Sequence, residues 1–189
     1  MARLLAITST KKQCMKQLII IFLSVIISNN LFSQDLNRDE KKLYELMMDY
    51  RKSKGQAVIP ISKSLTIVAQ THAQDLVVNN PIKNDCNMHS WSAKGNWKAL
   101  CYTANHANAE GMWNKPRELT NYQGNGYEIA YWHSAAATAF DALASWKTSA
   151  GHNALIINNG IWKTSKWNAI GIGIYKNYAV VWFGEEADN

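Results

Sequence analysis

A short apolar run near the N-terminus constrains this chain most, because it decides which residues fold together and in which compartment. The ten residues Leu18–Ile27 are apolar apart from one serine, and Lys16 precedes them. A helix that spans a bilayer needs about 20 apolar residues, whereas the core of a cleavable signal peptide is shorter. We therefore predict a signal peptide over residues 1–33, cleaved before Gln34, and no transmembrane anchor.

The predicted mature chain, residues 34–189, has the length of a single domain. Met15-Lys16-Gln17 has the form of a natural start, so initiation at Met15 is expected. Four of the 20 basic residues lie in the leader, which leaves 16 basic against 14 acidic residues in the mature chain. This weak positive balance does not indicate nucleic-acid binding, which usually requires a clustered basic face.

Export would place the mature cysteines in an oxidising compartment, either outside the cell or in a periplasm. Cys14 falls within the predicted leader, so Cys86 and Cys101 are the two that can pair. The segment between them is polar and turn-like, which favours a disulfide over the alternative of two buried free thiols. A bridge across a loop of about 15 residues contributes roughly 3 kcal/mol to stability.

Hydrophobic periodicity predicts a domain of helices followed by a terminal hairpin. Apolar residues recur at three- and four-residue spacing in two long segments, which is typical of helices with one buried face. Near the C-terminus the apolar residues alternate instead, with Lys176-Asn177 as the turn, which is typical of two paired strands. The pattern predicts an α+β domain with helices over the sheet. We expect helices at 37–54, 62–79, 135–146 and 151–158, and strands at 129–132, 167–175 and 178–184.

Residues 82–126 have no sustained period and are rich in Asn, Gly and Trp, so we expect a long loop. Four of the tryptophans fall in or beside it, namely Trp91, Trp97, Trp113 and Trp132. Exposed tryptophans there would suit a glycan or lipid ligand. The alternative is that they fill a small second core under the loop.

Three segments carry a resemblance to a known family. They are Asp85-Cys-Asn-Met-His-Ser90, Gly126-Tyr-Glu-Ile-Ala130 and Ser145-Trp-Lys-Thr-Ser-Ala-Gly-His152 with the residues that follow it. In this order, between a helix pair and a hairpin, they resemble the CAP superfamily of cysteine-rich secretory, antigen 5 and pathogenesis-related 1 proteins. The third segment is most similar to the bacterial SCP-like branch. The resemblance covers about Leu36–Glu185 and implies an α-β-α sandwich with an antiparallel sheet and a central cleft.

In this family two His and two Glu line the cleft and often hold a divalent cation. The resemblance assigns the two His to His89 and His152. The first Glu matches Tyr127 without a gap, or Glu128 after a shift of one residue. Such a shift reverses the face of a strand. The second Glu is replaced by Ser149, so the resemblance implies a weakened site for zinc, or for magnesium or calcium, on His89, His152 and Glu128.

The other histidines have separate expectations. His133, five residues after Glu128, is a candidate for the cleft together with Tyr127 and Ser149. His72 lies on the apolar stripe of the second helix and is expected to be a hydrogen-bonded core or rim residue. His106 lies in the long loop and is expected to be exposed.

The sequence lacks the Gly-x-Ser-x-Gly, His-Glu-x-x-His and P-loop signatures of common enzymes. We therefore expect a secreted, monomeric binding module whose His-lined cleft takes a cation or a small ligand without turnover. One alternative is a metal-assisted hydrolase acting on peptides or the cell envelope, with Glu128 as general base. Another is a glycan- or lipid-binding module that uses the loop tryptophans.

Overall fold

Three antiparallel strands form the centre of the domain in the computed structural model, which describes residues 35–188. They are β1 (Gly126–Trp132), β2 (Ala169–Tyr175) and β3 (Tyr178–Gly184), in the order β1-β3-β2. Strands β2 and β3 are the predicted hairpin, whereas β1 is longer than expected. The predicted signal peptide, Cys14 and the start at Met15 lie outside the described residues.

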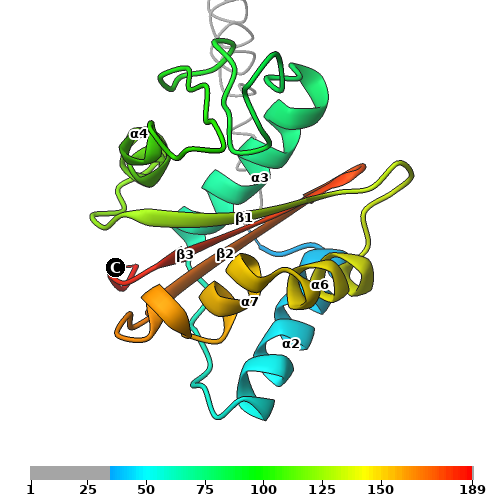
Figure 1. Cartoon of the computed structure of the whole chain (residues 1–189), viewed down its shortest axis with the longest axis vertical. Helices are drawn as coiled ribbons and strands as arrows, with labels where there is room; N and C mark the ends of the chain where they lie inside the picture. The colour runs from blue at the N-terminus through cyan, green and yellow to red at the C-terminus, as the bar shows by residue number, and fades with distance from the viewer. Residues whose placement is uncertain (1–34, 189) are drawn as a thin grey trace, which may run out of the picture. The chain divides into compact units, whose positions relative to one another are not determined.

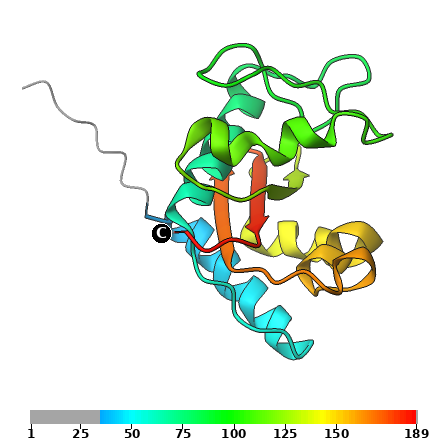
Figure 2. The ribbon, with the colours of Figure 1, turned by 90° about the vertical axis from the view of Figure 1, so that its left-hand side faces the viewer.

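Helices cover both faces of this sheet (Figures 1 and 2). Helix α3 (Lys63–Val78) packs on β2 and β3 from one side. Helices α2 (Arg38–Ser53), α6 (Ala139–Thr148) and α7 (Ala150–Ile156) lie on the other side, followed by the short 3-10 helix η1 (Gly160–Trp162). The predicted α+β class and the layered α-β-α arrangement are confirmed. No helix among residues 35–188 is both long and apolar enough to cross a bilayer.

The alternation of β3 divides the interior into two cores. Val180 and Trp182 enter a core built with α3, whereas Val181 and Phe183 enter a core built with α2, α6 and α7. All four side chains are completely buried. The sequence alternation predicted these two faces correctly. It did not reveal that β3 is the central strand, because adjacency along the chain shows only that β3 pairs with β2.

The two long helices begin at side-chain caps. Asn37 accepts hydrogen bonds from the backbone of α2 and Glu40 reciprocates, which forms a capping box. Ser62 caps α3 by accepting from the backbone N–H of Leu65 at 2.9 Å. The carboxylate of Asp188 accepts from the Ser62 hydroxyl and the Ser64 N–H, so Asp188 is fixed against the start of α3.

Two glycines of β2 allow α3 to lie directly on the sheet. A Cβ atom on Gly171 would lie 2.0 Å from the carbonyl carbon of Leu65, and one on Gly173 would lie 2.4 Å from that of Ala69. We expect Gly171→Ala to lose about 1–3 kcal/mol of unfolding free energy, because the helix backbone must move to make room. Urea denaturation measures this loss.

The matched control is Gly151→Ala, because a Cβ on Gly151 meets no atom within 4 Å. This variant should unfold at the urea midpoint of the parent or slightly above it, because Gly151 lies in α7 and alanine is the better helix former. An unchanged midpoint for Gly171→Ala would contradict the close approach of α3.

The long segment between α3 and β1 differs from the expected loop in one respect, because it contains two short helices, α4 (Ala109–Trp113) and α5 (Lys115–Leu119). Trp91 is buried in the α3-side core, and Trp97 and Trp113 pack against it. Trp132 is half exposed. Three of the four loop tryptophans therefore belong to a core, as the alternative expectation held, and the fourth is exposed.

Candidate functional site

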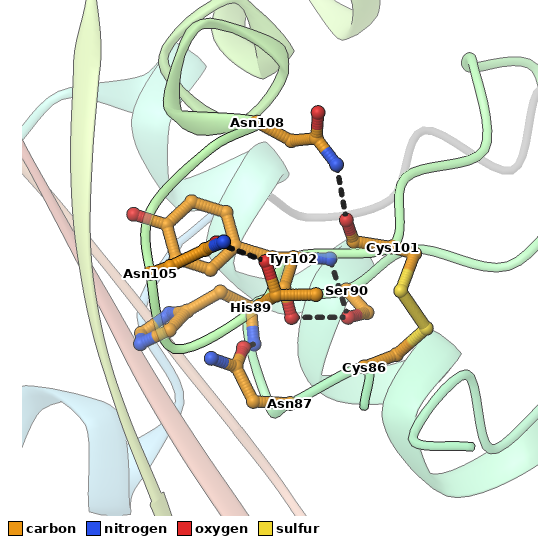
Figure 3. The surroundings of a disulfide bond; sticks show 9 residues. Cys86, Asn87, His89, Ser90, Cys101, Tyr102, Asn105 and Asn108 are labelled. Carbon is orange, nitrogen blue, oxygen red and sulfur yellow. Dashed lines mark hydrogen bonds between the residues drawn. A yellow bond between two sulfur atoms is a disulfide. The ribbon is translucent and has the colours of Figure 1, made fainter. Parts of the chain in front are cut away.

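A disulfide fixes the loop that carries the first candidate histidine. Cys86 and Cys101 are bonded, as predicted, with their Cα atoms 4.9 Å apart. Beside the bridge, the Asn87 N–H donates to the Tyr102 carbonyl at 2.8 Å. The Tyr102 N–H donates to the Ser90 hydroxyl at 2.9 Å (Figure 3). His89 lies between these two contacts along the chain, so its backbone is held by covalent and hydrogen bonds.

The register of β1 decides which of two neighbouring residues meets this loop. Glu128 lies opposite Trp182 in the ladder, so both point to the α3 side. Tyr127 points to the opposite side, where its ring packs 4.9 Å from that of Trp162. The structure thus brings Glu128, rather than Tyr127, against His89.

The carboxylate of Glu128 is shared between two imidazoles. Oε1 lies 2.6 Å from Nδ1 of His89, and Oε2 lies 2.5 Å from Nδ1 of His72. The Glu128 and His72 side chains are fully buried. The second ring nitrogen of His72 lies 3.0 Å from the Ser90 carbonyl, and the His72 ring stacks on Trp91 with centroids 4.2 Å apart.

Electrostatics keep this carboxylate ionised. Burial alone would raise the pKa of Glu128, but the charge of His72 and the hydrogen bonds from His72 and His89 lower that pKa to about 2. On the opposite wall, burial lowers the pKa of His152, and the proximity of His89 lowers it further. The neutral form of His152 is therefore favoured at neutral pH.

The candidates meet at a cavity of about 420 Å³ beside β1, an edge strand of the sheet. Its polar lining includes His89 and Glu128 from the α3 side, and Ser149 and His152 at the start of α7. Most other lining side chains are aromatic or aliphatic, among them Tyr102, Met112, Trp113, Tyr127, Leu155 and Trp162. The cavity is thus an apolar space with a few polar groups, as in many small-molecule sites.

Two further histidines have different positions. His133 follows the end of β1 and does not line this cavity; its Nδ1 accepts from the Ala135 N–H at 3.1 Å. The structure therefore does not place His133 in the cleft where the sequence suggested it. His106 is exposed as expected, yet it also lines the cavity, with Nδ1 2.8 Å from the Tyr102 hydroxyl.

His72 is the participant that sequence reasoning did not assign to the site. It is the hydrogen-bonded core residue expected from the apolar stripe of α3, but one of its bonds is to the candidate Glu128. The sequence holds one usable signal: a polar ring among residues that are otherwise apolar requires a buried partner. The sequence does not identify that partner.

The donor set does not fit the cation that the family resemblance implies. Both oxygens of Glu128 are already bonded to imidazoles, and the side chain has no exposed surface. Ser149 offers a hydroxyl where the family has a carboxylate. Within residues 35–188 no three His, Cys, Asp or Glu side chains are placed to hold one metal ion. Three histidines line the cavity, His89, His106 and His152, and the carboxylate beside His89 is the one that Glu128 already shares with His72.

Comparison with known proteins gives similarity in structure only. No family model and no curated protein matches the sequence. An extracellular SCP-domain protein from Bacillus anthracis aligns over 78% of this chain with a TM-score of 0.56 and 16% identity, and this alignment covers 40% of that protein. An outer surface protein of Borrelia burgdorferi aligns over 80% of this chain and 96% of its own length, with a TM-score of 0.52 and 19% identity.

A cysteine-rich secretory protein from Staphylococcus aureus gives a TM-score of 0.50 at 16% identity, over 80% of this chain and 40% of its own. The chain thus spans about 40% of the length of two of these three structures. All three alignments extend over most of the described domain. The layered α-β-α domain therefore has the fold of these bacterial SCP-domain and cysteine-rich secretory proteins.

Proposed function

We propose that this protein is an exported binding module whose cavity takes a small, largely apolar ligand without turnover. The cavity itself carries the proposal: about 420 Å³ is enough for a small organic molecule, and its walls are mainly aromatic and aliphatic. His89 and His152 supply the polar groups that would orient the ligand. A cation is the less favoured occupant, since the carboxylate it needs is already bonded.

Export is part of the same proposal. Two of the similar structures are described as an extracellular protein and an outer surface protein. The disulfide beside the site suits an oxidising compartment, and the predicted leader would deliver the chain there. We therefore place the domain outside the cell or in a periplasm, acting as a monomer on a ligand from its surroundings.

Catalysis is not favoured by the state of Glu128. A general base works best when its pKa lies near the working pH. Glu128 has its pKa lowered to about 2, and both oxygens already accept hydrogen bonds. This carboxylate is a weak base with no free oxygen, which argues against the metal-assisted hydrolase in which Glu128 activates water.

Blocking the cavity tests the binding function. The neutral dye N-phenyl-1-naphthylamine fluoresces in apolar surroundings, so its emission reports occupancy. We expect the parent to bind the dye and Ala109→Trp to lose at least ten-fold in affinity, a loss of about 1.4 kcal/mol, because Ala109 lines the cavity and the indole fills it. Fluorescence titration measures the difference.

The matched control is Ala107→Trp, which adds the same ring at an exposed position that does not line the cavity. It should bind the dye as the parent does. Equal binding by the parent and Ala109→Trp, or no binding by the parent, would contradict the proposed function. A His89→Ala/His152→Ala variant then tests whether the imidazoles contribute.

A further inference from the structure

The positions of the protons in the cluster of His72, Glu128 and His89 determine which ligand groups the cavity can recognise. Each of the two short contacts, Nδ1 of His72 to Oε2 and Nδ1 of His89 to Oε1, needs one shared proton. The Ser90 carbonyl near Nε2 of His72 can only accept, so that nitrogen must carry a proton as well. Three contacts therefore require three protons.

Three protons also make the cluster electrically neutral. With Glu128 as a carboxylate, His72 carries two protons and is an imidazolium, and His89 carries one, on Nδ1. A fourth proton would fit only on Nε2 of His89 and would leave a net positive charge beside the buried core. In the neutral arrangement Nε2 of His89 therefore keeps its lone pair.

We propose that His72 is a positioning residue for the cavity, which keeps Glu128 ionised and thereby fixes His89 with Nδ1 protonated and Nε2 as a hydrogen-bond acceptor. The cavity then selects apolar ligands that carry an uncharged donor such as a hydroxyl group. This ligand selectivity rests on the proposed binding function, whereas the positioning role of His72 does not. In this arrangement the His72 imidazolium supplies the positive charge that a cation would otherwise bring to the carboxylate.

The surroundings of His72 hold it in this role. It projects from α3, is fully buried and stacks on Trp91 at 8° between the ring planes. An indole face attracts a cation, so this stacking favours the charged ring. Its Ser90 partner lies one residue after His89, in the loop fixed by the disulfide. One loop therefore places both the imidazole that reaches the cavity and the carbonyl that keeps His72 protonated.

His89 connects the cluster to the ligand. It is the one histidine of the cluster that lines the cavity, with 19% of its side chain exposed. Since Nδ1 is bonded to Glu128, Nε2 is the ring nitrogen left for a ligand. Aromatic walls beside it, such as Trp113 and Trp162, suit a planar apolar body. A phenol combines such a body with a strong O–H donor.

The proton positions can be read directly by nitrogen-15 NMR of the histidine rings at neutral pH. We expect both ring nitrogens of His72 to be protonated, and His89 to be protonated on Nδ1 only. The exposed His106, outside the cluster, serves as the internal reference. A singly protonated His72, or a proton on Nε2 of His89, would overturn the proposal whether or not any ligand binds.

The ligand class is tested with 2-naphthol and 2-methoxynaphthalene, which differ by the O–H donor. Calorimetric titration of the disulfide-intact protein should show 2-naphthol binding roughly five-fold or more tightly than the ether, as one net hydrogen bond implies. The His72→Gln variant should lose this preference, because glutamine carries no charge and no longer keeps Glu128 ionised. Equal binding of the two probes by the parent, or binding of neither, overturns the ligand class. If N-phenyl-1-naphthylamine still binds in that case, the proposed binding function holds and only the ligand class is wrong.

Discussion

Glu128→Gln is expected to lose about 3–5 kcal/mol of unfolding free energy, the usual cost of removing one partner of a buried ion pair. The variant leaves the fully buried His72 ring without the carboxylate that is bonded to it. It also places an amide group against the ring nitrogens of His72 and His89, where the carboxylate accepted from both. Urea denaturation with and without the substitution measures the loss.

Glu110→Gln is the matched control, since it makes the same change at an exposed position of α4. Its urea midpoint should equal that of the parent. A second comparison uses the double variant His72→Gln/Glu128→Gln, which removes the charge and its partner together. The double variant should be less destabilised than the sum of the two single variants. Additive losses would contradict the pairing of these two side chains.

The same carboxylate predicts how acid acts on the domain. Its pKa is lowered from 4.5 to about 2 in the folded protein, so ionised Glu128 stabilises the fold above the unfolded-state value. This contribution is fully present above about pH 5 and is lost as the pH falls from there towards 2. Stability of the parent should therefore drop across this window, and Glu128→Gln should lack that part of the drop.

Local patterns predicted those parts of the fold in which sequence neighbours are also spatial neighbours. The helix stripe containing Leu43 and Met47 is buried as expected. The alternation of apolar residues in β2 and β3 predicted the paired strands of the hairpin and their two buried faces. The disulfide followed from cysteine count and compartment. Each of these inferences uses a period or a pairing that a single segment displays.

The rest depends on contacts between distant segments. The position of β1 beside β3 fixes that Glu128 faces α3, and one residue of slip would have exchanged it with Tyr127. His72 has two polar partners, 18 and 56 residues away in sequence, so its periodic stripe shows burial but not bonding. His133 is close to Glu128 in sequence, yet it lies beyond the strand end and away from the cavity.

The cavity depends on both layers of the sandwich, so its shape depends on how α7 is attached to the domain. A buried arginine is part of that attachment. Arg51 of α2 is 3% exposed and donates to the Ile156 carbonyl at the end of α7 and to the Asn158 side chain. Its Nε also donates to the Ala57 carbonyl at 2.9 Å. Burial lowers the pKa of Arg51 to about 10, so the guanidinium stays charged at neutral pH.

Arg51→Met is expected to lose about 2–4 kcal/mol of unfolding free energy, because the substitution keeps an apolar stem but leaves the Ile156 and Ala57 carbonyls without this donor. Ser149 and His152 lie at the start of the same short helix and line the cavity. Loosening the end of α7 should therefore also weaken the binding of N-phenyl-1-naphthylamine. Urea denaturation, hydrogen exchange of α7 and dye titration follow the three effects.

Arg38→Met is the control in the same helix, where the side chain is exposed, and it should change none of these quantities. Arg51→Lys separates charge from geometry, because an ammonium group keeps the charge but lacks the planar fork that reaches three acceptors. We expect it to recover only part of the loss. Full stability in Arg51→Lys would mean that charge alone holds α7. Full stability in Arg51→Met would mean that the apolar core of α2, α6 and α7 positions His152 without the guanidinium.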